Sequence, residues 1–361
     1  MDLHTLSNNF PALLDSGKSI ELVGPPGVGK SDFVRQQVAA ASVRTGQEWG
    51  FATLFLATMT PPDLLGYMVP DHDSRGNAVS RFTMPPWMQT SNHRLVSDYP
   101  RGILFLDEYG QGDADVKRAS AELLLNRRIG PWELPDGWSV IAASNRAKDR
   151  SGVTKAFDFV INRRVEINID PSVSAWEKWA MDVGIDPLIQ FFATQNPGIV
   201  FDGDVPKEQG PWCTPRSLVA AGDVLHALRG GNPDREMLTD AVARELVAGT
   251  IGNAATLQLM ATLTLAYNMP SVADIIANPE TTSVPDKPDA AMLVAHQLAS
   301  YVEVDTIDPI STYMERFPRE FSVSFATQMM KRSVEFRHAI LETPAMSRWI
   351  KANGALFAAI Q

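Results

Sequence analysis

The feature that most constrains the fold of this chain is a glycine-rich segment near its N-terminus, Gly24-Pro25-Pro26-Gly27-Val28-Gly29-Lys30-Ser31. The segment fits the pattern G-x-x-x-x-G-K-[ST]. It follows an apolar run at 19–23 that predicts a buried strand, and it precedes residues 31–43, which predict a helix. In this context the glycines let successive backbone N–H groups point at phosphate oxygens, and the helix N-terminus adds the positive end of its dipole. We therefore expect a phosphate-binding loop in an α/β fold.

The residues of this loop predict how a nucleoside triphosphate would be held. The Lys30 ammonium is expected to reach the β- and γ-phosphates, and the Ser31 hydroxyl is expected to ligate Mg²⁺. The expected cofactors are ATP and Mg²⁺. The predicted nucleotide contacts are Gly24, Pro25, Pro26, Gly27, Val28, Gly29, Lys30, Ser31 and Asp32.

Polar side chains follow two further predicted strands. The apolar run at 102–106 leads directly into Asp107 and Glu108, and the run at 139–143 is followed by Ser144 and Asn145. Ligands of open parallel sheets bind at the carboxyl ends of the strands. We expect Asp107 to hold the Mg²⁺ shell and Glu108 to position and deprotonate the attacking water. The Asn145 carboxamide can hold that water or a γ-phosphate oxygen.

Four arginines are candidates for stabilising the charge that phosphoryl transfer places on the γ-phosphate. Arg163 and Arg164 lie just before a strand predicted at 165–169, and a surface ion pair is the alternative reading of each. An arginine supplied in trans by a neighbouring subunit is a common means of stabilising that charge, and both residues are candidates for this role. Arg216 begins a predicted helix and is expected to fold back onto the nucleotide. Arg128 is a weaker candidate for a subunit interface.

The pattern of strands and helices predicts an α/β domain followed by helices. Strands and helices alternate over residues 1–171, which predicts a parallel sheet with helices on both faces. The strand signal nearly vanishes afterwards, so we expect an all-helical lid at 172–253 and a helical C-terminal region of unknown role at 254–361. Predicted helices there include 173–183, 187–195, 215–228 and 235–248.

Two hairpins are predicted within the α/β part. The first lies in an insert at about 61–88, with strands at 67–70 and 78–84, inside a helix that resumes near Pro86. Its residues Tyr67 and Met68 could grip a polypeptide if the hairpin lined a pore, but local packing explains them as well. The second hairpin is expected at 129–138, with its turn at Pro135-Asp136-Gly137.

Composition limits the class of protein. The chain has 361 residues, 45% of them hydrophobic, and a net charge of -10. A long basic stripe, the usual mark of a nucleic-acid binder, is missing from the sequence, although a small basic pore would be compatible with the charge. Cys213 is the only cysteine and is expected to be buried. No uninterrupted apolar run approaches the roughly 18 residues of a membrane span, and residues 1–15 do not read as a signal peptide. We expect a soluble, cytoplasmic protein with no membrane contact and no metal other than Mg²⁺.

Taken together, these motifs resemble AAA+ ATPases of the MoxR class. The matching segments are GPPGVGKS (24–31), LFLDE (104–108), SNR (144–146), INRR (161–164) and TPR (214–216). The insert with PPDLLGY looks like the helix-2 insertion of that clade, and residues 173–197 resemble the start of its helical lid. The resemblance covers about residues 15–250. One departure is Asn162-Arg163-Arg164, where the family often has Asp-Arg-Phe.

The resemblance implies a hexameric ring of identical subunits with nucleotide at the subunit interfaces. Lys30, Ser31, Asp107, Glu108, Asn145 and Arg216 would take the cis roles and Arg163 the trans role. It also implies Mg²⁺-dependent ATP hydrolysis that drives protein remodelling or chaperone-like work on a protein client, with a von Willebrand factor A domain protein as a possible partner. The alternatives are a nucleic-acid-linked motor or a restriction-type GTPase or ATPase of the same clade, and a scaffold that binds nucleotide only to assemble. Glu108 argues against the scaffold, because a pure binder needs no water-activating carboxylate.

Overall fold

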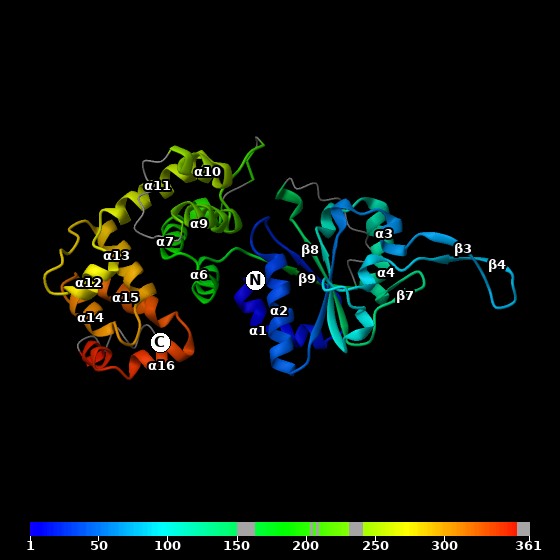
Figure 1. The fold of residues 1–361 in the computed structure, drawn as a ribbon, viewed down its shortest axis with the longest axis horizontal. Coiled ribbons are helices and arrows are strands. Elements are labelled where there is room, and N and C mark those ends of the chain that lie inside the picture. The colour runs from blue at the N-terminus through cyan, green and yellow to red at the C-terminus, as the bar shows by residue number, and fades with distance from the viewer. Residues whose placement is uncertain (150–162, 203–204, 207–208, 231–240, 352–361) are drawn as a thin grey trace. The chain divides into compact units, whose positions relative to one another are not determined.

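The computed structural model describes residues 1–149, 163–202, 205–206, 209–230 and 241–351 (Figure 1). The chain forms two compact units, Met1–Ser172 and Val173–Gln361. The division falls where the strand signal ends in the sequence.

A five-stranded sheet in the order β2-β5-β8-β1-β9 forms the centre of the first unit. All of its neighbouring strands are parallel. Parallel neighbours need crossover connections, which carry helices to the two faces of the sheet. The α/β fold class predicted from the sequence is confirmed. The strands are β1 (Ile20–Val23), β2 (Trp49–Phe55), β5 (Arg101–Asp107), β8 (Trp138–Ser144) and β9 (Val165–Asn168).

Alternate residues of strands β2, β5 and β8 enter two separate hydrophobic cores, one on each face of the sheet. Ile103 and Phe105 of β5 pack with residues of α1 and α2, whereas Leu104 and Leu106 pack with residues of α3 and α4. Figure 1 shows α2 and α4 on opposite sides of the sheet. The helices are α1 (Leu3–Asp15), α2 (Lys30–Thr45), α3 (Pro61–Leu65) and α4 (Ala114–Asn126). Short 3₁₀ turns are η1 (Leu56–Thr58), η2 (Pro86–Met88), η3 (Val96–Asp98), η4 (Tyr109–Gln111) and η5 (Ala147–Asp149).

The helix α1 is not among the elements predicted from the sequence. The Asp2 side chain caps it by accepting a hydrogen bond from the Thr5 backbone N–H at 2.8 Å. Its buried residues Leu6, Phe10 and Leu14 join the core that contains α2. The apolar positions recur every four residues, so the period of a helix is present, although Pro11 lies within it.

The inserted hairpin consists of β3 (Met68–His72) and β4 (Ala78–Phe82), paired antiparallel, and it projects from the unit in Figure 1. Tyr67 and Met68 at its base are 61% and 63% exposed. The helix expected to resume near Pro86 is reduced to η2. It ends at Met88, because Gln89 is extended, with φ -121° and ψ 145°, and forms an antiparallel β-bridge with Leu95.

The second hairpin has a different turn from the one predicted. Its strands are β6 (Arg128–Ile129) and β7 (Trp132–Glu133), so the chain reverses at Gly130-Pro131. Gly130 has a φ of +54°, which suits glycine. The prediction that the hairpin turns at Pro135-Asp136-Gly137 is wrong. That segment makes a separate turn, in which the Trp138 N–H donates to the Pro135 carbonyl at 3.3 Å and β8 begins.

The described part of the second unit contains helices and no strand. This confirms the helical region predicted after the sheet, although the start of the helix predicted at 235–248 lies outside the described residues. Two hydrophobic cores hold the helices together, one around α7, α9 and α11 and one around α13, α14 and α15. The helices are α6 (Val173–Asp182), α7 (Pro187–Gln195), α8 (Pro197–Val200), α9 (Pro215–Arg229), α10 (Ala241–Ile251), α11 (Asn253–Tyr267), α12 (Val272–Ala277), α13 (Pro288–Tyr301), α14 (Ile307–Met314), α15 (Arg319–Met330) and α16 (Val334–Leu341).

Within the described residues, one helical stretch, Asn253–Ala277, has the length and composition of a membrane span. It covers 25 residues at a mean hydropathy of 1.2. Core helices of soluble proteins have the same properties. The stretch is also broken between α11 and α12, and its residues Leu259 and Leu263 are buried among other helices. Taken alone, it is weak evidence for a membrane.

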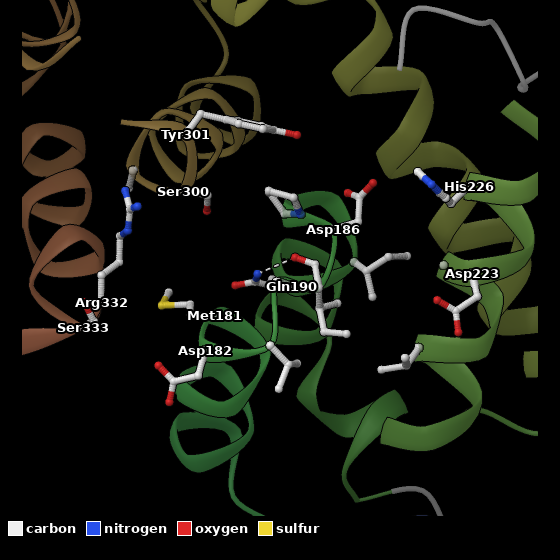
Figure 2. A pocket seen from close by; sticks show the side chains of 18 of the residues that line it. Met181, Asp182, Asp186, Gln190, Asp223, His226, Ser300, Tyr301, Arg332 and Ser333 are labelled. Atoms are coloured by element: carbon white, nitrogen blue, oxygen red, sulfur yellow. Dashed lines mark hydrogen bonds between the residues drawn. The ribbon is translucent and has the colours of Figure 1, made fainter. Parts of the chain in front are cut away.

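A cavity of about 730 Å³ lies among the helices of this unit. Figure 2 shows Asp182, Asp186 and Asp223 around it. The Gln190 side chain donates a hydrogen bond across its floor to the Ile185 carbonyl at 2.7 Å, drawn as a dashed line. None of the site residues predicted from the sequence lines this cavity.

Several polar groups are buried in the helical unit, and one of them joins helices that are far apart in the sequence. The Glu177 carboxylate on α6 is 3% exposed, and it accepts hydrogen bonds from Gln328 Nε2 at 2.8 Å and Lys331 Nζ at 2.7 Å. His296 on α13 is also buried, and burial lowers its pKa to about 4. Cys213 is buried as expected, and burial raises the pKa of its thiol to about 12.

The pKa of His296 predicts an acid-sensitive helical unit. An unfolded histidine takes up a proton near pH 6.5, whereas the buried ring does so only near pH 4. Its stabilising contribution is therefore complete above pH 6.5 and is lost as the pH falls toward 4. Between pH 7 and pH 5 the free energy of unfolding should fall by about 2 kcal/mol through this group. Chemical denaturation of the full chain, followed by circular dichroism at several pH values, measures this loss.

The His296→Leu variant should lose most of this pH dependence, because the group that titrates is gone. Exposed His338 provides the matched control, and His338→Leu should keep the wild-type dependence. Equal pH dependence in the two variants would show that His296 does not cause it.

Candidate active site

The glycine-rich loop connects the end of β1 to the start of α2. Gly29 has a φ of +100°, a conformation that L side chains rarely adopt, and it immediately precedes α2. At Gly24 a β-carbon would lie 2.9 Å from Ile169 Cβ, so only glycine fits beside the end of β9. Both glycines of the motif are therefore required by local geometry. The loop leads the chain to Lys30 as the first residue of the helix.

Lys30 is turned back into the loop and is 8% exposed. Its Nζ donates to the carbonyl oxygens of Gly24 at 2.9 Å and Pro25 at 3.0 Å, and to Asn145 Oδ1 at 2.9 Å. A buried ammonium needs such acceptors, because an unpaired buried charge is costly. Lys30 is thus held against the loop at which phosphates are expected.

Asn145 links the lysine to the predicted general base. Its Oδ1 accepts from Lys30, and its Nδ2 donates to Glu108 Oε2 at 3.1 Å. Asn145 is 6% exposed and follows directly after β8. The three side chains come from three segments of the sequence and form one hydrogen-bonded chain.

Ser31 and Asp107 form a separate hydrogen-bonded pair next to these three side chains. The Ser31 hydroxyl donates to Asp107 Oδ2 at 2.8 Å, between the first turn of α2 and the last residue of β5. Hydroxyl and carboxylate oxygens are ligands that Mg²⁺ prefers. The donor set therefore fits the predicted metal, with Ser31 and Asp107 as the residues that would hold it.

Glu108 has a backbone conformation that is unusual for a residue with a side chain. Its φ is +51° and its ψ is 37°, in the left-handed region. A non-glycine residue there carries a strain of roughly 1 kcal/mol or more, and such residues cluster at functional sites. The turn directs the chain sharply away from β5 into η4. Asp107 and Glu108 are adjacent in sequence, yet Asp107 bonds to Ser31 and Glu108 to Asn145.

The two adjacent arginines lie in different environments. The Arg164 side chain is 4% exposed and forms an ion pair with the buried carboxylate of Glu21; a second ion pair joins it to Glu166 at 3.2 Å. Arg163 is exposed, just before β9. Arg164 is therefore paired within its own chain, and Arg163 is the exposed member of the two.

The remaining predicted site residues stay as predictions. Arg216 is exposed in the first turn of α9, where Thr214 caps the helix, and it belongs to the helical unit. Arg128 is exposed on β6. Asp32 is exposed in the first turn of α2 and lies 3.5 Å from Arg35.

Sequence reasoning missed a buried polar group next to the site. Glu21 is 3% exposed at the second position of β1, and Tyr109 and Lys117 are 1% exposed nearby. Burial raises the pKa of the Glu21 carboxyl, while Arg164 and Ser144 act in the opposite direction. Burial also raises the pKa of Tyr109 to about 12 and lowers that of Lys117, whose Nζ donates to the Gly110 carbonyl at 2.7 Å. The signal in the sequence was a glutamate within an otherwise apolar strand.

Comparison with known proteins finds only distant similarity to solved structures. No protein-family model matches the chain, and no curated protein matches it. Among solved structures, NtrX from Brucella abortus in complex with ATP is 14% identical, with a TM-score of 0.39 over 97% of this chain and 67% of that one. The Holliday junction branch migration motor RuvB from Thermotoga maritima is 12% identical, with a TM-score of 0.37 over 95% and 88% of the two chains. These low values assign neither a family nor a function.

The position of Lys30 predicts the first test of the site. Lys30→Ala removes the one ammonium that the loop holds beside Asn145, so the dissociation constant for ATP should rise about 100-fold or more. Titration with a fluorescent ATP analogue measures the change. Lys18 is exposed outside the loop, and Lys18→Ala should bind as the wild type does. Equal binding by both variants would contradict a phosphate site at this loop.

Proposed function

We propose that this chain is a Mg²⁺-dependent ATPase that works as a ring of identical subunits. The observation that carries the proposal is the hydrogen-bonded chain from Lys30 through Asn145 to Glu108, lying beside the pair formed by Ser31 and Asp107. A phosphate-binding ammonium, a carboxamide, a carboxylate that can accept a proton and a metal-ligand pair are the groups that phosphoryl transfer to water requires.

Each side chain has a role that follows from its contacts. Lys30 is bonded to neutral oxygens, and the charged oxygens of a triphosphate are stronger acceptors, so they can take over its hydrogen bonds. Ser31 and Asp107 would hold Mg²⁺, which supplies positive charge that neutralises the phosphates. Asn145 lies between Lys30 and Glu108 and can orient a water toward the carboxylate.

Glu108 is the candidate general base. It accepts a proton from water while the water oxygen bonds to the γ-phosphorus and the bond to the β-phosphate oxygen breaks, which yields ADP and inorganic phosphate. The strained backbone of Glu108 supports this assignment, because it separates the carboxylate from the metal-binding Asp107.

The location of Arg163 supports a shared active site. Val165 of β9 pairs with Ile20 at the start of β1, whereas Asn168 pairs with Val23 at its end. Arg163 therefore lies at the edge of the sheet where the parallel strands begin. The loop with Lys30 lies at the opposite edge, where the strands end. With about 3.3 Å per residue, the length of β1 separates these two edges. An arginine at the far edge suits the nucleotide of a neighbouring subunit better than its own.

For the finer role we propose remodelling of a protein client by a MoxR-type ring in the cytoplasm, with a von Willebrand factor A domain protein as a possible partner. The exposed Tyr67 and Met68 on the inserted hairpin and the net charge of -10 support a protein rather than a nucleic acid as the client. DNA-stimulated turnover that weakens steeply with salt would instead indicate the nucleic-acid-linked motor, and a preference for GTP would indicate the restriction-type enzyme.

Two substitutions test the ATPase. Glu108→Gln should lower the turnover of ATP about 100-fold or more and leave ATP binding intact, because the amide cannot take a proton from water. Arg163→Ala should lower turnover about 1000-fold, again without weakening binding to the isolated subunit. Phosphate release at a series of protein concentrations measures both effects.

Wild-type activity per subunit should also rise with protein concentration, since each site needs a neighbour. Arg44 is an exposed arginine at the end of α2, and Arg44→Ala should behave as the wild type does. Activity per subunit that is independent of concentration, together with a fully active Arg163→Ala variant, would rule out a shared site. Normal turnover by Glu108→Gln would remove the general-base assignment.

A further inference from the structure

Glu21 is a charged residue in β1, an interior strand of the parallel sheet. Ile20 and Leu22 on either side of it belong to the core that contains α1 and α2. Because successive residues of a strand point to opposite faces, Glu21 faces the side of the sheet that α4 covers. Apolar side chains of β5 and β8 form the core on that face, including Leu104 and Ala142.

The Glu21 carboxylate contacts one residue from each of the two neighbouring strand regions. Its Oε1 accepts a hydrogen bond from the Ser144 hydroxyl at 2.5 Å. Its Oε2 forms the ion pair with Arg164, and the two side chains are 5% and 4% exposed. The Arg164 guanidinium also lies 5.9 Å from the ring centroid of buried Tyr109. The carboxylate therefore links a residue at the carboxyl edge of the sheet to one at the amino edge.

Each of the two partners of Glu21 is adjacent in sequence to a residue of the proposed active site. Ser144 comes directly before Asn145, which contacts Lys30 and Glu108. Arg164 comes directly after Arg163, the exposed arginine. The Glu21 carboxylate thus holds Ser144 and Arg164. Ser144 is the neighbour of Asn145, which is proposed to contact the nucleotide of its own subunit, and Arg164 is the neighbour of Arg163, which is proposed to reach the next subunit.

Stability alone gives little reason for such a pair. Removing two charges from water costs about as much as their attraction returns, and two well-packed apolar residues commonly stabilise a core as well or better. In some proteins a buried ion pair instead specifies a single geometry. Here that geometry fixes the backbone at the start of β9 against β1 and β8.

We propose that Glu21 is a positioning residue that holds Arg163 in place for the nucleotide site of the neighbouring subunit. Glu21 also bonds to Ser144, the residue before Asn145. Through this bond, the nucleotide contacts of Asn145 in one subunit are linked to the position of Arg163, which the same subunit offers to the next. The inference rests on the proposed ATPase with a shared site.

The double variant Glu21→Leu with Arg164→Leu tests the proposal. It removes both charges together, so the unfolding temperature should equal or exceed that of the wild type. The dissociation constant for ATP should stay within about twofold, because Lys30 and the loop are unchanged. Turnover should fall about tenfold or more, because Arg163 is no longer held. Glu166 also pairs with Arg164 but is exposed, and Glu166→Gln should keep turnover within about twofold of the wild type.

Mixed rings then locate the defect. Lys30→Ala subunits should bind ATP about 100-fold more weakly or worse, but they carry an intact Arg163 and its Glu21 anchor. Adding them to the double variant should restore turnover at the double variant's own sites, because the arginine comes from the neighbour. If the ion pair instead acts on the nucleotide site of its own subunit, the mixture should turn over ATP as slowly as the double variant alone.

Two results would overturn the inference: wild-type turnover by the double variant, or lost turnover that the mixture does not restore. If the double variant unfolds, Glu21→Gln replaces it in the same mixture, because glutamine keeps an acceptor for Ser144 and loses only the charge that faces Arg164. A wild type that does not hydrolyse ATP, or an Arg163→Ala variant with full turnover, would remove the proposed function itself. The Lys30→Ala and Arg163→Ala controls distinguish the two failures.

Discussion

The parallel pairing of β1 with β8 and β9 is the constraint on which the rest of the α/β unit depends. It aligns Val23 with Ser144, while β8 in turn pairs with β5. The loop, the carboxamide and the acidic pair therefore leave the sheet at the same edge, although they come from distant parts of the sequence. A register shift of one residue would turn the side chains of a strand to the other face and would separate these groups. The many apolar contacts of the two cores fix that register, and the polar site depends on them.

Local sequence is sufficient where the chemistry of a segment admits one conformation. Gly29 and Lys30 belong to such a segment, and the strand, loop and helix around them follow from it. The second hairpin shows the opposite case, because both Gly130-Pro131 and Pro135-Asp136-Gly137 are suitable turns. Only the pairing of Arg128 with Glu133 selects between them. Turn residues identify places where a chain can reverse, and contacts with the rest of the fold decide where a hairpin closes.

Glu21 and Arg164 show why part of the site could not be read from the sequence. Each residue alone suggests the wrong environment, since a glutamate is unexpected in a buried strand and an arginine pair suggests a solvated surface. The fold brings them together, and each explains the burial of the other. The assignment of Arg163 as the exposed member depends on this partner, which no local pattern identifies. Long-range pairs of this kind are visible only when the order of the strands is known.

The buried thiol of Cys213 gives the helical unit a built-in reporter. Its raised pKa means that almost no thiolate exists near neutral pH, and its side chain is covered by other residues. An alkylating reagent therefore reacts only in the moments when the surrounding helices separate. Since the chain has no other cysteine, the rate of its modification counts the opening events of this one unit. Comparing the labelling rate with and without nucleotide would then show whether nucleotide bound at the edge of the sheet changes how often the helical unit opens.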